Sequence, residues 1–279
     1  MQGYPPPPTP NVRRPRKPAG PRMGPGQASG SVVLDEDSTC MVTGAARGLG
    51  CEWVAHLLWA GCAVVATVRD PEGPGSQRLR EFARAVGDGR LRLVRMDVSD
   101  PASVEAAMEE VAAMFSPTGR RLDLLVNNAG VYGPAKAGQS LDSVTQADFE
   151  DVLRVNCAGP VLVAQQAARR DLLGEGSVVL NVSSKMGSVQ DNGSGGTYAY
   201  RAAKAALNVC TKSLDHDLSS RGAHAVLFHP GYVQTDMTGG NGLIDTTDSV
   251  SGMLDTLLDL TFPQDEFTWY DFKGNKVPW

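Results

Sequence analysis

A glycine-rich segment near residue 44 constrains the fold of this chain more than any other feature. Apolar residues 40–42 indicate a short buried strand, and residues 48–59 carry the apolar pattern of a helix. Between them lies Thr43-Gly44-xxx-Gly48-x-Gly50. Glycines in such a turn let the main chain approach a pyrophosphate, and the helix N-terminus offers it free N–H groups. The turn therefore predicts a dinucleotide site, although the spacing is not GxGxxG and an ordinary tight turn remains the alternative.

The same alternation of strand and helix continues along the chain. Further strands are expected at 63–68, 91–96, 122–126, 177–182 and 223–228. Further helices are expected at 76–86, 101–115, 148–168 and 198–219. Strands that are apolar throughout and separated by helices are typical of a parallel sheet covered on both faces. The pattern predicts one doubly wound α/β domain over residues 35–279.

Residues 1–34 have a different composition from the rest of the chain. Nine of the 18 prolines, five glycines and five basic residues fall within residues 1–30, and the first acidic residue is Asp35. A segment rich in Pro and Gly and poor in aromatic residues cannot offset its own ordering entropy. We therefore expect a disordered or polyproline-type arm over 1–34, with an organelle-targeting role as an alternative.

Composition excludes several classes of function. The net charge of -5 divides into +5 for residues 1–30 and -10 for the rest (21 basic and 31 acidic residues), and an acidic body is a poor nucleic-acid binder. No apolar stretch is long enough for a membrane span, and no secretory signal is visible. The five cysteines form no CxxC pair and the four histidines no HExxH, so we expect no metal site and a reducing, cytoplasmic location.

The end of the second strand indicates which nucleotide is bound. An acidic residue at this point would favour NAD through the ribose hydroxyls, but the tip here is Val68-Arg69-Asp70. Arg69, together with Arg47 of the glycine turn, offers two guanidinium groups to a 2′-phosphate. This favours NADP(H). NAD(H) remains open, because Asp70 could accept a hydrogen bond from the ribose.

Other polar residues follow the third and fourth strands. Residues 127–130, Asn-Asn-Ala-Gly, come after the fourth strand, and Asp97 with Val98 ends the third. Ligands of open parallel sheets bind at this carboxyl edge. The sequence-predicted cofactor contacts up to this point are Gly44, Arg47, Gly48, Leu49, Gly50, Arg69, Asp97, Val98, Asn128, Ala129 and Gly130.

Four residues could perform the chemistry. Tyr200 and Lys204 are neighbours on one helix face, and a nearby ammonium favours the phenolate, which would lower the pKa of the phenol. Ser184 follows the strand at 177–182, where its hydroxyl could bind a substrate oxygen. Asn156 lies within the helix at 148–168, where Asn is mildly unfavourable. It could hold a water in a proton relay to Lys204, or simply bond the main chain.

Together these motifs resemble those of the short-chain dehydrogenase/reductase family over about residues 38–279. The matching residues are Thr43, Gly44, Gly48, Gly50, Asp97, Val98, residues 127–130, Asn156, Ser184, Tyr200, Lys204, Pro230, Gly231 and Thr235, in the family's order and spacing. Residues 229–237, 249–253 and 272–279 are similar to the C-factor-like and sniffer-like carbonyl reductase branch. Relative to that branch, Phe272 and Lys273 form an insertion after Tyr270-Asp271.

The resemblance implies a seven-stranded parallel Rossmann sheet, an NAD(P)(H) cofactor and interconversion of a carbonyl and an alcohol. It implies that Tyr200 is the acid/base, Ser184 positions the substrate oxygen and Asn156 anchors a relay water. Lys204 would bind the nicotinamide ribose and lower the pKa of Tyr200. The loop at 230–235 would hold the nicotinamide carboxamide; its predicted contacts are Pro230, Gly231, Val233 and Thr235.

The function and the oligomeric state each have two possible answers, and the substrate class has a weaker signal. A Rossmann domain that senses cofactor or signals by protein contact is the alternative to an enzyme, although a sensor needs no reacting residues. A homodimer formed through the helices that carry Asn156 and Tyr200 stands beside a monomer. Glycine-rich and polar stretches at 187–196 and 239–247 favour small or polar carbonyl substrates.

Overall fold

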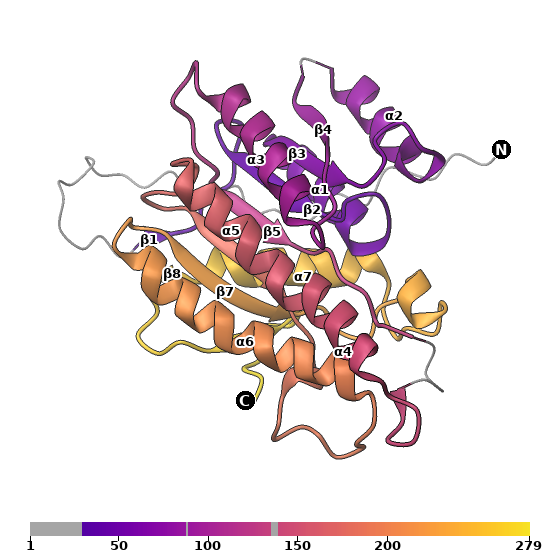
Figure 1. The fold of residues 1–279 in the computed structure, drawn as a ribbon. Helices are drawn as coiled ribbons and strands as arrows, with labels where there is room; N and C mark the ends of the chain where they lie inside the picture. The colour runs from indigo at the N-terminus through magenta and orange to yellow at the C-terminus, as the bar shows by residue number, and fades with distance from the viewer. Residues whose placement is uncertain (1–29, 88, 135–138) are drawn as a thin grey trace.

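A seven-stranded parallel sheet forms the centre of the molecule (Figure 1). The computed structural model describes residues 30–87, 89–134 and 139–279. The strand order is β4-β3-β2-β5-β6-β7-β9, with every neighbouring pair parallel. The strands are β2 Thr39–Thr43, β3 Ala63–Val68, β4 Leu91–Arg95, β5 Leu124–Asn127, β6 Val178–Val182, β7 His224–His229 and β9 Trp269–Asp271. The expected doubly wound, seven-stranded Rossmann sheet is confirmed.

Helices cover both faces of this sheet. They are α1 Gly48–Trp59, α2 Gln77–Val86, α3 Pro101–Phe115, α4 Gln146–Leu153, α5 Gly159–Arg169, α6 Tyr198–Ser219 and α7 Thr246–Asp259. Short 3₁₀ turns lie at Pro74–Ser76 (η1), Lys185–Gly187 (η4) and Asp236–Thr238 (η5). The helix α7 and the strand β9 have no counterpart among the ranges expected from the apolar pattern.

Each face of the sheet has its own hydrophobic core. In β2, Cys40 and Val42 pack with α1 and α7, whereas Met41 between them packs with α3 and α5 on the other side. Successive side chains of a strand point to opposite faces, so a continuous apolar run serves both cores.

The expected boundary of the N-terminal arm is wrong by five residues. Residues 1–29 lie outside the described residues, but β1 (Gly30–Ser31) pairs antiparallel with β8 (Thr261–Phe262). Val32 and Leu34 are buried in the core that α1 and α7 share. Burial of the Val32 and Leu34 side chains stabilises the attachment of this segment to the domain.

The helix expected at 148–168 is interrupted at its centre. The helices α4 and α5 are joined by a π turn, Arg154–Ala158 (η3), in which the N–H of Gly159 donates to the carbonyl of Arg154. Pro160 follows at the start of α5. A proline has no N–H, and its ring clashes with the carbonyl four residues earlier, which is that of Asn156. The π turn accommodates that clash, and such turns are frequent at functional sites.

No helix among the described residues is long and apolar enough to cross a membrane.

Candidate active site

The glycine turn is held against the end of β5. A Cβ atom on Gly44 would lie 2.8 Å from Cα of Ala129, and Gly44 has a φ of 64° that favours glycine. The side-chain amide of Asn128 donates to the carbonyls of Thr43 (3.0 Å) and Gly44 (3.3 Å). The N–H groups of Asn128 and Ala129 donate to the hydroxyl of Thr43 at 3.1 Å. Asn128 therefore shapes the turn by its amide, rather than pointing that amide at a cofactor.

The N-terminus of α1 fits the pyrophosphate of a dinucleotide. Arg47 occupies the N-cap position without a side-chain capping bond, and the first turn contains no acidic residue. Gly48 has a φ of 54°, and a Cβ there would lie 3.5 Å from the methyl group of Thr235. Uncapped N–H groups at a helix N-terminus are an anion site, and glycine keeps the approach open. Leu49 packs its side chain on the core instead.

The expected nucleotide-selecting residues are exposed beyond this turn. Arg47 donates to the carboxylate of Asp236 at 2.6 Å, an ion pair that joins the glycine turn to η5. Arg69 is exposed at the end of β3. The Oδ1 atom of Asp70 accepts hydrogen bonds from the N–H groups of Glu72 (3.2 Å) and Gly73 (3.0 Å). Asp70 is therefore turned into its own loop.

Asp97 and Val98 follow β4 at the same edge of the sheet. The Oδ1 of Asp97 accepts from the hydroxyl (2.7 Å) and the N–H (2.9 Å) of Ser99, and these bonds, with a smaller effect of Arg69, lower the pKa of the carboxyl. The carbonyl of Val98 faces Gly159, where a Cβ would lie 2.8 Å away, and the Val98 side chain is buried. Asp97 thus stays ionised beside Arg69.

Tyr200, Lys204 and Ser184 meet at the carboxyl end of β6. Tyr200 and Lys204 are buried on α6, with the ammonium 5.8 Å from the centre of the phenol ring. Lys204 donates to the carbonyl of Val182 at 2.8 Å. The hydroxyl of Ser183 donates to Asn208 at 2.6 Å inside the protein. The hydroxyl of Ser184 accepts from the N–H of Met186 at 3.2 Å and lies near enough to Tyr200 to lower the pKa of the phenol. Of the two serines, Ser184 is thus the one beside the reacting group.

Burial controls the charge of this pair. It raises the pKa of Tyr200 to about 12, against a lowering by the hydrogen bond from Ser184. It lowers the pKa of Lys204 to about 8. Burial has the largest effect on both groups, because removing water from them disfavours both charged forms. The expected lowering of the Tyr200 pKa by Lys204 stays a prediction. At neutral pH the phenol keeps its proton.

Asn156 bonds the main chain through both ends of its side chain. Its Oδ1 accepts from the N–H of Val131 (3.0 Å), and its Nδ2 donates to the carbonyl of Val131 (2.7 Å). Gly130 lies against it, since a Cβ there would be 2.8 Å from Asn156 Oδ1 and 3.9 Å from Lys204 Nζ. Both the oxygen and the nitrogen of this side chain therefore have a main-chain partner, and the main-chain carbonyl of Asn156 cannot accept from residue 160, because proline has no N–H.

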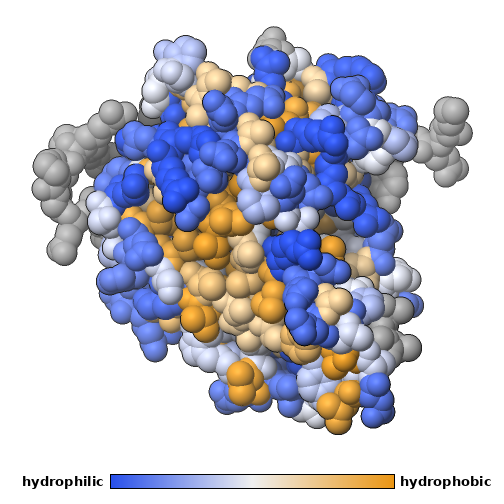
Figure 2. Space-filling model, viewed as in Figure 1, coloured by the Kyte–Doolittle hydropathy of each residue, from blue (hydrophilic) through white to orange (hydrophobic). Residues whose placement is uncertain are grey.

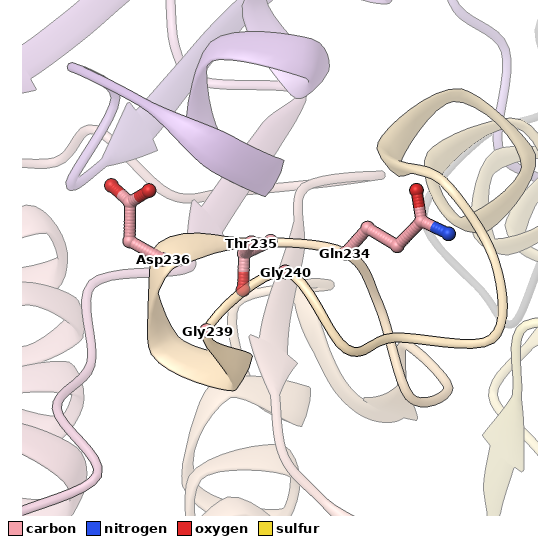
Figure 3. A pocket seen from close by; sticks show the side chains of 5 residues that line it. All are labelled: Gln234, Thr235, Asp236, Gly239 and Gly240. Atoms are coloured by element: carbon pink, nitrogen blue, oxygen red, sulfur yellow. The ribbon is translucent and has the colours of Figure 1, made fainter.

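The loop after β7 is folded back on itself beside the glycine turn. The N–H of Gln234 donates to Ile244 (2.9 Å), and Val233 is buried in a bridge with Ile244. Gly231 has a φ of 87°, and the carbonyl of Pro230 accepts from Ser249 at 2.6 Å. A hollow of about 570 Å³ opens on this loop. Figure 3 shows the residues that line it, which are Gln234, Thr235, Asp236, Gly239 and Gly240. The hollow adjoins Gly48 through Thr235.

Two residues of this site carry no signal in the sequence. Tyr132 packs at a tilt against Tyr200 with ring centres 4.9 Å apart, and its hydroxyl lies 3.3 Å from that of Thr197. Asp236 faces Arg47 from a distant loop. No local pattern marks a tyrosine or an aspartate in a loop, because their partners are brought close only by the sheet. Among the described residues there is no cluster of His, Cys, Asp and Glu that could hold a metal ion.

Known proteins share this sequence and fold. The family model for short chain dehydrogenase matches residues 38–242. The chain is 41% identical over 160 residues to the C-signal of Myxococcus xanthus, covering 57% of this chain and 93% of that protein. A carbonyl reductase from chicken fatty liver, solved with NADPH bound, is similar with a TM-score of 0.78 and 33% identity over 86% of this chain and 98% of its own. The carbonyl reductase Sniffer of D. melanogaster has a TM-score of 0.76 and 28% identity, covering 87% and 99%.

These similarities confirm the expected resemblance, including its C-factor-like and sniffer-like branch. The family match spans the glycine turn, the edge residues after β4 and β5, and the Ser184, Tyr200 and Lys204 group. The chain belongs to the short-chain dehydrogenase family.

Proposed function

We propose that this NAD(P)-dependent oxidoreductase reduces a carbonyl compound with NADPH, and that Tyr200 donates the proton. The observation that carries the proposal is that buried Tyr200 and Lys204 lie with half-buried Ser184 at the sheet edge where the glycine turn also lies. Atoms balance as carbonyl, NADPH and one proton giving alcohol and NADP⁺. When bound, the nicotinamide supplies the hydride.

The residues of the chain then have separate roles. Ser184 and the phenol of Tyr200 hydrogen-bond the carbonyl oxygen and hold it in place. Tyr200, whose raised pKa of about 12 keeps it protonated, gives its proton to that oxygen. Lys204, protonated below its pKa of about 8, binds ribose hydroxyls and resupplies the proton. Asn156 fixes the main chain at Val131 and offers its own carbonyl to a relay water.

The charges at the open end support NADP(H) over NAD(H). Asp70, which could accept from an NAD ribose, already accepts two main-chain N–H groups of its own loop through Oδ1. Arg47 and Arg69 are exposed, and a phosphate could engage both guanidinium groups. The similar carbonyl reductase from chicken was solved with NADPH, which agrees with this choice.

Turnover with a panel of aldehydes and ketones tests the proposal. Purified protein should oxidise NADPH, followed at 340 nm, and Tyr200→Phe should not. Tyr198→Phe, which removes a phenol hydroxyl from an exposed tyrosine two residues away, is the matched control. No oxidation above that of Tyr200→Phe on any carbonyl would overturn the enzymatic function.

A sensing or signalling role is the second candidate, favoured by the similarity to the C-signal. Such a role needs the nucleotide site alone. NADPH binding by calorimetry, combined with no Tyr200-dependent turnover, is the result that would support it.

We also propose that the chain forms a homodimer through α5 and α6. An apolar patch lies in the middle of the face where these helices run (Figure 2). Val209 on α6 is 70% exposed, and Val161 and Leu162 on α5 are half-buried. Light scattering should give twice the chain mass for the wild type and one chain mass for Val209→Glu. Ser220→Glu, at the exposed end of α6, is the control.

A cytoplasmic location is proposed as well, because all five cysteines are free thiols. Fluorescent fusions with and without residues 1–29 should both distribute through the cytoplasm. Loss of an organelle signal on deletion would instead assign those residues a targeting role.

A further inference from the structure

Tyr132 touches the first turn of α6 at two points. Its ring packs at a tilt against that of Tyr200, with centres 4.9 Å apart and planes inclined by 42°. Its hydroxyl lies 3.3 Å from the hydroxyl of Thr197, the residue that precedes α6. The two contacts lie on either side of Tyr198, so Tyr132 spans the start of the helix that carries the reacting phenol.

Thr197 adopts a conformation that its residue type disfavours. Its φ of 54° and ψ of 43° place it in the left-handed region, where a β-branched residue is a genuine outlier. Such residues persist where the surroundings hold them. Here the N–H of Thr197 donates to the carbonyl of Gln139 at 2.9 Å, and its hydroxyl meets that of Tyr132.

Tyr132 is itself held from both sides. The carbonyl of Tyr132 accepts from the amide of buried Gln139 at 3.0 Å. The preceding residue, Val131, is bonded at both its N–H and its carbonyl by Asn156. The ring therefore has little freedom to leave Tyr200, and it shields one side of that phenol from water.

We propose that Tyr132 is a positioning residue, which aims the phenol of Tyr200 through its ring and fixes the start of α6 through its hydroxyl. The inference rests on the proposed function of Tyr200. Removing the ring should admit water to the phenol, while removing the hydroxyl alone should release Thr197.

The other charged and titratable groups around Tyr200 do not involve Tyr132, so the effect of Tyr132 on the Tyr200 phenol can be measured separately. Lys204 lies 5.8 Å from its ring centre, and Ser184 lowers the pKa of the phenol. Cys157 of η3 raises the pKa of Lys204. Lys185 pairs with Asp191 at 3.6 Å. Arg201 donates to the carbonyl of Gly196 and to the hydroxyl of Ser194. None of these is altered by changing Tyr132, which itself raises the pKa of Tyr200.

Two substitutions separate ring from hydroxyl. Tyr132→Leu should lower kcat for carbonyl reduction by about three- to tenfold, the value of one aromatic pair, with KM for NADPH unchanged. Tyr132→Phe should lower kcat by a smaller factor. Adding Thr197→Gly to Tyr132→Phe should restore kcat, because glycine adopts the left-handed region freely. Tyr198→Leu, which removes an exposed ring from the same turn, should leave kcat unchanged.

A titration gives a readout that does not depend on turnover. The Tyr200 resonance in ¹³Cζ-tyrosine NMR, assigned with Tyr200→Phe, should report a lower pKa in Tyr132→Leu than in the wild type. An unchanged kcat and an unchanged Tyr200 titration in Tyr132→Leu would overturn the inference. If Tyr200→Phe itself retains full turnover, the proposed function fails instead, and the NMR shift still decides whether Tyr132 shields the phenol.

Discussion

The two ends of the proposed cofactor crevice treat charge in opposite ways. At the reacting end, Lys204 and Tyr200 are only 5% and 7% exposed. Burial lowers the pKa of Lys204 and raises that of Tyr200, so the neutral form of each is favoured. At the nucleotide-selecting end, the side chains of Arg47 and Asp236 are 73% and 72% exposed. Buried groups interact strongly, whereas exposed pairs are screened by solvent and salt. Substitutions should therefore have large, salt-independent effects at one end and small, salt-dependent effects at the other.

Tyr200→Phe should have the largest effect. Removing the proton donor is expected to lower kcat for carbonyl reduction by about 10²- to 10⁴-fold. Calorimetry should show NADPH binding within twofold of the wild type, since the ring and its packing remain. A fall of less than tenfold would mean that another group protonates the oxygen.

Lys204→Met should follow, with a loss of roughly 10- to 100-fold, the value of a charged hydrogen bond. The pH profile identifies its cause. Lys204 is a cation below its pKa of about 8 and neutral above it, while Tyr200 keeps its proton to about 12. In the wild type, kcat/KM for reduction should hold through neutral pH and fall above about 8. In Lys204→Met that alkaline fall should disappear, and its persistence would assign it to another group.

Arg69→Gln should weaken NADPH binding by about tenfold and leave NADH binding unchanged, because only NADPH carries the 2′-phosphate. Calorimetry with both nucleotides at two salt concentrations measures this. The exposed Arg95→Gln, on the neighbouring strand β4, is the control. Equal losses for both nucleotides would contradict a role in phosphate recognition.

Asp236→Asn should change NADPH affinity less than Arg69→Gln does, and should raise it rather than lower it. Asp236 competes with the 2′-phosphate for Arg47, so its neutralisation should tighten NADPH binding by up to about fivefold at low salt. The gain should vanish at high salt and in the Arg47→Gln background. A gain that survives in that background would show that Asp236 acts on the nucleotide directly.

Deleting residues 1–29 should affect neither the reacting end nor the nucleotide-selecting end of the crevice. We expect unaltered kcat/KM and melting temperature, since every described strand remains. Deleting residues 1–34 is the matched comparison, because it also removes β1 and the buried Val32 and Leu34. That deletion should lower the free energy of unfolding by at least about 2 kcal/mol. Loss of turnover in the shorter deletion would place residues 1–29 within the catalytic unit.

Elements with strong local signals were predictable in detail. The helix α3 begins at Pro101 after Asp100, whose carboxylate accepts from the N–H of Ala102, as expected of a cap. The helix α1 and the strand β3 have the expected bounds, Gly48–Trp59 and Ala63–Val68. The interruption of the long helix was missed, although Pro160 was a visible signal for it.

The candidate site was predictable only in part. Family motifs locate Ser184, Tyr200 and Lys204, and the structure brings them together. The structure adds that the amide of Asn128 bonds the glycine turn and that burial raises the pKa of Tyr200, while the cofactor contact of Asn128 stays a prediction. Both outcomes depend on what surrounds a side chain, which spacing along the chain does not contain.

By itself, the sequence determined six of the seven strands of the sheet, the glycine turn and the residues placed at the carboxyl edge of the sheet. These follow from apolar patterning and from residue types that act over a few positions. Only the tertiary structure decided that Arg47 pairs with Asp236, 189 residues away, and that Tyr132 lies on Tyr200, 68 residues away. The reason is physical: burial and long-range contacts set the charge of Tyr200 and Lys204, and both exist only once the strands are side by side.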